Sequence, residues 1–290
     1  MKTDNTYRDI GRFLFSCSDR PGIVAEITRF LFDFGANIVN LDQHTLDPFG
    51  GQFFMRIEFY LPQLDEREAE LRAAFSRVAE AFAARWRFAV ANRKKKLALY
   101  VSRSDHTLIE LLYHLRNGDL YGDVKMVISN HADLEPIVRA QEIPFHHVPK
   151  TAASRDAAER REWELLGNDV DLIVLARYMQ IISPQFLARF PNRIINIHHS
   201  FLPAFAGADP YGAANERGVK LIGATAHYVT EELDAGPIIE QDVMRVDHGH
   251  SVEDMRRIGR SVERAVLTRA VDWHLHDRII VYQNKTIVFV

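Results

Sequence analysis

The strongest local feature whose residue types and spacing could support catalysis is Asn196-Ile197-His198. It continues a β-strand that we expect to begin at Arg193, so Asn196 and His198 project from the same face. An amide donor beside an imidazole could stabilise one developing oxyanion. An isolated Asn-x-His also fits a turn cap and a satisfied buried histidine, and taken alone it favours that structural interpretation.

A carboxylate follows 38 residues after Asn196, in the segment Asp234-Ala235-Gly236-Pro237. Gly-Pro indicates a tight reversal between two strands, which places Asp234 in a loop at a strand end. Catalytic groups are often held at such positions. For this residue taken alone, an ordinary aspartate turn is the simpler interpretation.

The 13 histidines make a histidine-based metal site worth testing against the sequence. His198, His199, His227 and Asp234 offer ligand types that zinc accepts. No His-Glu-x-x-His motif occurs, however, and His199 should point away from His198 if the strand continues. We therefore predict no metal and no cofactor.

Composition limits the classes of function. A chain of 290 residues suggests two domains, and a net charge of −3 gives no reason to expect a nucleic-acid partner. The lone Cys17 cannot form an internal disulfide, which fits a reducing compartment. No run of 18 apolar residues predicts a membrane span, and the polar start lacks a signal sequence. We expect a cytoplasmic protein.

The elements that would position these residues fall into two groups, 1–92 and 93–290, separated near the basic run 92–96, which we interpret as a solvated linker. The first group has the order βαββαβ, a ferredoxin-like arrangement. Its predicted strands are 10–17, 38–46, 52–61 and 86–90, and its predicted helices are 23–34 and 65–84.

The second group alternates short apolar strands with helices, which predicts a mostly parallel, open α/β sheet of the Rossmann type. The carboxyl ends of such strands face the usual ligand crevice. Predicted strands are 97–101, 124–129, 171–176, 193–198, 221–229 and 237–246; predicted helices are 106–117, 133–141, 154–167 and 251–274, with a hairpin over 278–290.

Several motifs together carry a family resemblance. The C-terminal half resembles the folate-dependent formyltransferases through Asn196-x-His198, Ser200-x-Leu202-Pro203, Asp234-x-Gly236-Pro237 and the run 175–184. The N-terminal part resembles an ACT domain through Cys17-x-Asp19-x-x-Gly22-Ile23-Val24 and Gly35-Ala36-Asn37-Ile38. This pairing is similar to the formyltetrahydrofolate deformylase family, whose members hydrolyse 10-formyltetrahydrofolate to tetrahydrofolate and formate.

The resemblance implies specific roles. It assigns catalysis to Asn196, His198 and Asp234. It implies an amino-acid effector site and assembly into a homo-oligomer through the ACT-like domain, although this domain could serve assembly alone. Folate would contact Met179, Gln180, Ile181, Ile182, Thr230, Glu231 and Leu233, with core packing the competing interpretation for Met179 and Ile181. The effector would contact Asp19, Pro21, Gly22, Ile23, Asn37 and Ile38.

The sequence also bears on the acceptor of the formyl group. The related glycinamide ribonucleotide transformylases resemble one another in a glycine-rich loop, after the first strand, that holds a phosphate of the amine substrate. Here that place reads Ser102-Arg103-Ser104-Asp105-His106, without glycine and with an acidic group, which favours water.

One departure from the deformylase pattern puts turnover in question. Where the pattern has lysine and histidine this chain has Asp209 and Gly212. A formyltransferase with an amine acceptor, and a folate- or amino-acid-binding module without turnover, stay open as alternatives.

Overall fold

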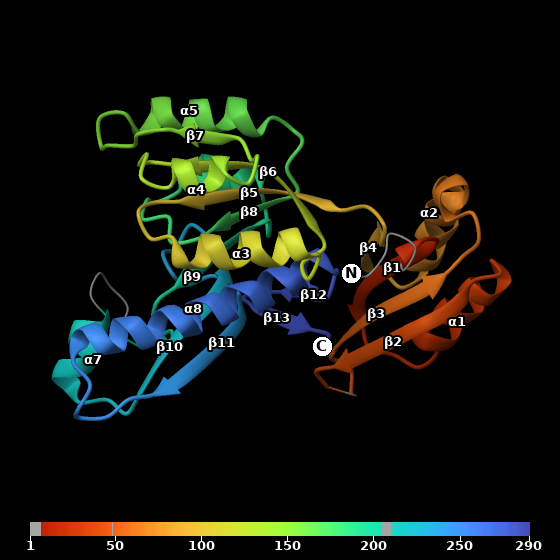
Figure 1. Cartoon of the computed structure of the whole chain (residues 1–290). Coiled ribbons are helices and arrows are strands. Elements are labelled where there is room, and N and C mark those ends of the chain that lie inside the picture. Colours follow the sequence, from red (N-terminus) through yellow and green to blue (C-terminus); the bar gives the residue numbers. More distant parts are fainter. Residues whose placement is uncertain (1–6, 48, 205–209) are drawn as a thin grey trace. The chain divides into compact units, whose positions relative to one another are not determined.

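The computed structural model describes residues 7–47, 49–204 and 210–290, and it divides into two compact units (Figure 1). The first unit contains the chain up to Lys94 together with His276–Ile280 and Ile287–Val290. The second contains Lys95–Leu275 and Val281–Thr286. A single boundary at residue 92 does not describe this arrangement, because the end of the chain returns to the first unit.

The first unit is an antiparallel sheet with strand order β2-β3-β1-β4, and two helices complete the predicted βαββαβ order. Alternate residues of the central strand, among them Phe13 and Phe15, join a core with Ile27 and Phe75 of the helices. The elements are β1 (Ile10–Ser18), α1 (Ile23–Asp33), β2 (Asn37–Thr45), β3 (Gln52–Tyr60), α2 (Leu64–Ala81) and β4 (Arg85–Val90).

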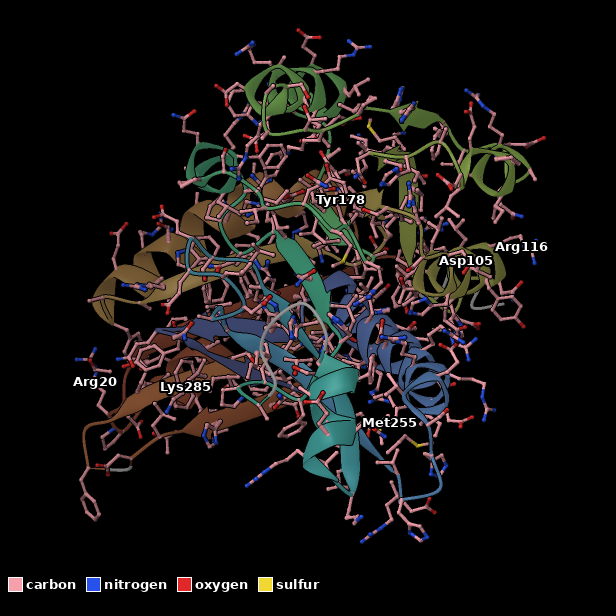
Figure 2. All side chains as sticks on the ribbon, turned by 90° about the vertical axis from the view of Figure 1, so that its left-hand side faces the viewer. Arg20, Asp105, Arg116, Tyr178, Met255 and Lys285 are labelled. Atoms are coloured by element: carbon pink, nitrogen blue, oxygen red, sulfur yellow. The ribbon has the colours of Figure 1, made fainter. Side chains whose placement is uncertain are left out.

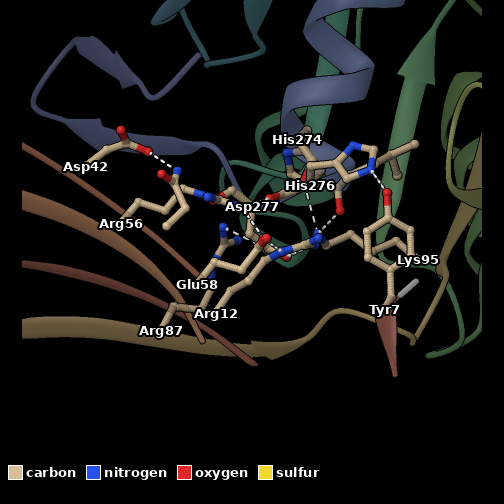
Figure 3. A network of polar contacts seen from close by, with 12 residues as sticks. Tyr7, Arg12, Asp42, Arg56, Glu58, Arg87, Lys95, His274, His276 and Asp277 are labelled. Carbon is tan, nitrogen blue, oxygen red and sulfur yellow. Dashed lines mark hydrogen bonds and ion pairs between the residues drawn. The ribbon is translucent and has the colours of Figure 1, made fainter. Parts of the chain in front are cut away.

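Buried charges occupy the other face of this sheet (Figure 3). Arg12 and Glu58 are paired across β1 and β3, and Arg12 Nε donates to Glu58 Oε2 over 2.7 Å. Arg56 donates to the same oxygen and, through Nε, to the backbone oxygen of Asp277. The Asp277 carboxylate lies 3.7 Å from Arg12 and 3.2 Å from Arg87. A buried arginine requires such partners, which explains why the C-terminal segment returns here.

The second unit contains a seven-stranded sheet of order β11-β10-β9-β8-β5-β6-β7. Strands β9 to β7 in this order are parallel, and β10 is antiparallel to both neighbours, so the mostly parallel α/β sheet is confirmed. The strands are β5 (Lys95–Val101), β6 (Gly122–Ser129), β7 (Phe145–His147), β8 (Leu172–Leu175), β9 (Ile194–His198), β10 (Leu221–Tyr228) and β11 (Ile238–Arg245).

Helices cover both faces of this sheet, as the buried apolar residues of its central strands require. Tyr100 and Ile173 of the sheet share a core with Ala158 of α5 and Phe186 of α6, whereas α3 and α8 pack against each other (Figure 1). The helices are α3 (His106–Asn117), α4 (Glu135–Arg139), α5 (Arg155–Leu166), α6 (Pro184–Arg189), α7 (Pro210–Arg217) and α8 (Val252–Leu275).

Several details differ from the sequence predictions. The strand β7 and the helices α6 and α7 were not predicted, because each is too short to show a clear periodic pattern. The basic run 92–96 is not all linker: Lys95 and Lys96 begin β5, and Lys95 Nζ donates to the carbonyls of His274 and Leu275 at the C-terminus of α8. There, a cation also compensates the helix dipole.

The chain ends in the predicted hairpin, formed by β12 (Ile279–Tyr282) and β13 (Lys285–Val288). None of the helices in the described part of the chain combines the length and apolar character needed to cross a membrane.

Candidate active site

The three residues assigned to catalysis meet at the end of β9. Asn196 and His198 lie two apart on this strand, and Asp234 comes from the loop between β10 and β11. His198 Nδ1 is 3.2 Å from Asp234 Oδ2. The His198 side chain is 7% exposed and that of Asp234 is 18% exposed. The carboxylate therefore faces an imidazole that is almost shielded from solvent.

The loop that presents Asp234 depends on two unusual backbone positions. Asp234 has a φ of 56°, in the left-handed region that aspartate tolerates better than most residues. Gly236 passes so close to Tyr228 that an added Cβ would lie 1.8 Å from its carbonyl oxygen. Only glycine allows this close approach, which accounts for the Asp-x-Gly-Pro spacing.

His227, considered in the sequence only as a metal ligand, is part of the same cluster. It is the cross-strand neighbour of Asn196 in the β9–β10 pairing. Its Nδ1 is 3.0 Å from the Tyr228 carbonyl, so this nitrogen carries the proton and Nε2 is left as an acceptor. Asn196 Nδ2 lies 3.2 Å from that Nε2 and donates to it. His227 thus fixes which way the Asn196 amide points.

The charge state of the cluster follows from these contacts. The hydrogen bond from His198 is the largest cause that holds the pKa of Asp234 below its usual range, so the carboxylate is ionised at neutral pH. His198 Nδ1 is engaged by this carboxylate, while its buried Nε2 has no hydrogen-bond partner among the described residues. A buried, unpaired ring nitrogen is costly unless a ligand completes it. His198 Nε2 is therefore the atom available to a substrate.

The neighbouring His199 does not join this arrangement. Its ring packs between those of His198 and Tyr211, with centroids 5.2 and 5.9 Å away. Burial, together with the charge of Arg177, lowers the pKa of His199 to about 4, so this imidazole is neutral. Within the described ranges, no group of three or more His, Cys, Asp or Glu side chains is arranged to hold a metal ion.

The predicted folate-contacting residues divide into two kinds. Met179 and Ile181 are 58% and 61% exposed, which excludes core packing for both. Ile182 is buried in the core that also contains Phe186 of α6. Gln180 is partly exposed between its neighbours.

The second predicted stretch lies in the loop before Asp234. Leu233 is 69% exposed, Glu231 is exposed, and Thr230 is partly buried, with its hydroxyl donating to the Glu232 carbonyl. This loop therefore presents an apolar side chain immediately beside the carboxylate of the cluster.

In the segment after β5, side chains make hydrogen bonds to buried groups of other elements. Ser102 donates to Asn130, and His106 Nε2 lies 2.9 Å from Glu263 Oε2. Glu263 is 2% exposed and also accepts from Tyr211 and faces Arg177 at 3.5 Å. The sequence did not reveal this cluster, because Glu263 lies within an ordinary amphipathic helix.

Asp209 lies outside the described residues. Gly212 lies within α7, next to Tyr211, whose hydroxyl contacts Glu263.

A separate cavity of about 760 Å³ opens in the first unit. Four of the residues considered for effector binding line it, namely Asp19, Pro21, Gly22 and Ile23. Thr45 also lines it and donates to Asp19 over 2.7 Å. The predicted contacts Asn37 and Ile38 are not among its lining residues; they pair with Tyr60 and Phe59 at the start of β2.

Comparison with known proteins gives consistent matches to both units. The formyl transferase family model matches residues 95–271, and the ACT domain model matches 12–76. The chain is 54% identical to a formyltetrahydrofolate deformylase of Bacillus subtilis, over 97% of this chain and 94% of that protein. A Mycobacterium tuberculosis protein of the same name is 57% identical over 97% and 91%. The crystal structure of a formyltetrahydrofolate deformylase from Pseudomonas syringae pv. tomato matches with a TM-score of 0.92 and 46% identity, over 99% of this chain and 97% of that one.

Proposed function

This chain belongs to the formyltetrahydrofolate deformylase family, and we propose that Asn196, His198 and Asp234 carry out its hydrolysis of 10-formyltetrahydrofolate to tetrahydrofolate and formate. The observation that carries the assignment is the buried His198 Nε2, which lacks a partner among the described residues while Nδ1 is held by an ionised carboxylate.

The chemistry requires a nucleophile, an oxyanion and the removal of two protons from water. The oxygen of water bonds to the formyl carbon, and the carbonyl electron pair moves onto oxygen. When this intermediate collapses, the bond to N10 breaks and N10 takes one of the two protons, while the other passes to solvent and formate leaves. Asn196 Nδ2, oriented by His227, and His198 Nε2 donate to the oxyanion. Asp234 holds the water, stabilises protonated His198 and relays the proton towards N10.

Water, rather than an amine, is the acceptor that this geometry supports. The loop after β5 offers no glycine, and its helix start is occupied by the His106–Glu263 pair. A buried carboxylate at that position repels a phosphorylated acceptor. The hydrolysis needs no redox partner, and we propose that it requires no metal or cofactor beyond folate.

The first unit contains an ACT domain. We propose that the cavity lined by Asp19–Ile23 binds a small amino acid linked to one-carbon metabolism, such as glycine or methionine. We also propose that the chain forms a homo-oligomer and works in the cytoplasm. An effector would have to change kinetics or melting temperature; if neither glycine nor methionine changes either one, the regulatory role fails.

The function is tested with purified protein and 10-formyltetrahydrofolate in the absence of any added acceptor. Formate release that persists in the presence of a chelator is the expected result. Turnover that appears only with an amine acceptor would establish a transferase instead. Folate binding without either product would leave a binding module.

A further inference from the structure

The loop 178–183 carries the exposed side chains Met179 and Ile181, yet both of its ends are anchored in a buried charged cluster. The cluster consists of Lys150 and two carboxylates of α5, Glu159 and Glu162. The catalytic chemistry proposed above does not use these groups. Their side chains are 2%, 7% and 0% exposed, respectively.

Each carboxylate holds one end of the loop. Tyr178 OH donates to Glu162 Oε1 over 3.0 Å, where the loop begins. At the other end, the backbone N–H of Ser183 donates to Glu159 Oε1 over 3.2 Å, and its hydroxyl donates to Glu159 Oε2. Glu159 and Glu162 are three residues apart on one helix and therefore share a face. Figure 2 labels Tyr178, which packs between the sheet and α5.

Lys150 compensates the negative charge of these two neighbouring carboxylates. Its Nζ lies 3.2 Å from Glu159 and 3.4 Å from Glu162. Two buried carboxylates without a cation would repel each other and the loop would lose its anchors. Burial raises the pKa of the Tyr178 hydroxyl, so it keeps the proton that it donates.

The part of the loop between its ends is also fixed through the backbone. Met179 N–H donates to Ser102 Oγ over 3.0 Å, and Arg155 donates to the Ile181 carbonyl over 3.1 Å. The exposed apolar side chains are therefore presented by a backbone that is held before any ligand arrives. Such preorganisation lowers the entropy cost of binding.

We propose that Lys150, Glu159 and Glu162 are positioning residues that set folate affinity by holding loop 178–183 in its binding conformation. This inference rests on the proposed function for the identity of the ligand. The residues do not touch the reacting atoms, so their loss should raise KM and leave kcat almost unchanged.

The chain offers a matched control for the test. Tyr178→Phe removes the hydroxyl that holds the start of the loop, and Ser183→Ala removes a hydroxyl at its end. Tyr100 packs against Tyr178 with ring centroids 5.2 Å apart, but its buried hydroxyl has no hydrogen-bond partner among the described residues. Tyr100→Phe therefore makes the same chemical change in the same core without releasing the loop.

KM comes from formate release, and the Kd for tetrahydrofolate comes from calorimetry. In Tyr178→Phe we expect KM and Kd to rise about tenfold, because the variant loses a hydrogen bond to a charged group. We expect kcat to stay within about twofold of the wild-type value. Ser183→Ala should change both in the same direction, and Tyr100→Phe should change neither.

The inference is overturned if Tyr178→Phe and Ser183→Ala raise KM and Kd no more than Tyr100→Phe, or if they lower kcat alone. The Kd for tetrahydrofolate tests this inference independently of the proposed hydrolysis. Weaker tetrahydrofolate binding in Tyr178→Phe would support it even if the wild-type protein released no formate.

Discussion

Replacing Asp234 by asparagine tests the centre of the proposed mechanism. The change keeps the shape of the side chain and removes its charge, so the loop held by Gly236 should stay in place. Asparagine also tolerates the left-handed backbone that Asp234 adopts. The effect of the substitution therefore reports on the charge rather than on misfolding.

The expected loss follows from the distance between the two groups. At 3.2 Å from His198 Nδ1, a carboxylate stabilises a protonated imidazole by about 5 kcal/mol at an effective dielectric constant of 20. If most of this energy acts in the transition state, kcat falls by about 10³ to 10⁴. The proposed folate contacts, among them Met179 and Leu233, do not include this carboxylate, so KM should change little.

The assay is single-turnover formate release at neutral pH, with tetrahydrofolate binding measured in parallel. Asp234→Asn should bind tetrahydrofolate with an unchanged Kd and release formate at least 10³-fold more slowly. A loss in rate of less than tenfold would refute the reasoning, because the carboxylate could not then be supporting His198.

Two further substitutions test neighbouring parts of the site. His227→Phe removes the acceptor that orients the Asn196 amide, so kcat should fall about 10- to 100-fold with KM nearly constant. An unchanged kcat would contradict this role. His227→Gln restores an acceptor and should recover part of the loss in kcat. The folded pKa of His199, about 4, lies below its unfolded value of 6.5, so the folded state binds fewer protons between these pH values and stability falls as pH drops through them. The loss in the free energy of unfolding amounts to about 3 kcal/mol. Urea unfolding of wild type and His199→Gln at pH 7 and pH 4.5 should show a smaller loss in the variant. Equal losses in the two proteins would exclude His199 as the cause.

The parts of the site that could be predicted from the sequence depend on local geometry. Asn196 and His198 project together because side chains on a strand alternate, and Asp234 follows from its Gly-Pro turn. His227 could not be placed in the same way. Its contact with Asn196 depends on the register between β9 and β10, which sets these two residues directly opposite each other. That register is a property of the folded sheet.

The same distinction explains the other differences. Met179, Ile181 and Ile182 are all apolar, so residue type does not distinguish them. The backbone of the anchored loop exposes the side chains of Met179 and Ile181 and buries that of Ile182. The sequence shows that Arg12 and Asp277 are charged. It does not show that these residues, which are 265 positions apart in the chain, lie 3.7 Å from each other in the folded protein. Long-range charge pairing leaves no periodic pattern, whereas the βαββαβ order and the α/β alternation do.

The return of the C-terminal segment imposes an order on the assembly of the protein during synthesis. Arg12 and Arg56 are buried in the first unit, and both contact Asp277, in a segment that the ribosome makes roughly 180 residues after that unit's first stretch ends. At typical elongation rates this interval lasts roughly ten seconds or more. During that time the sheet of the first unit can form, but its two buried arginines lack their last partner. The N-terminal domain therefore reaches its final stability only when the whole chain has been translated.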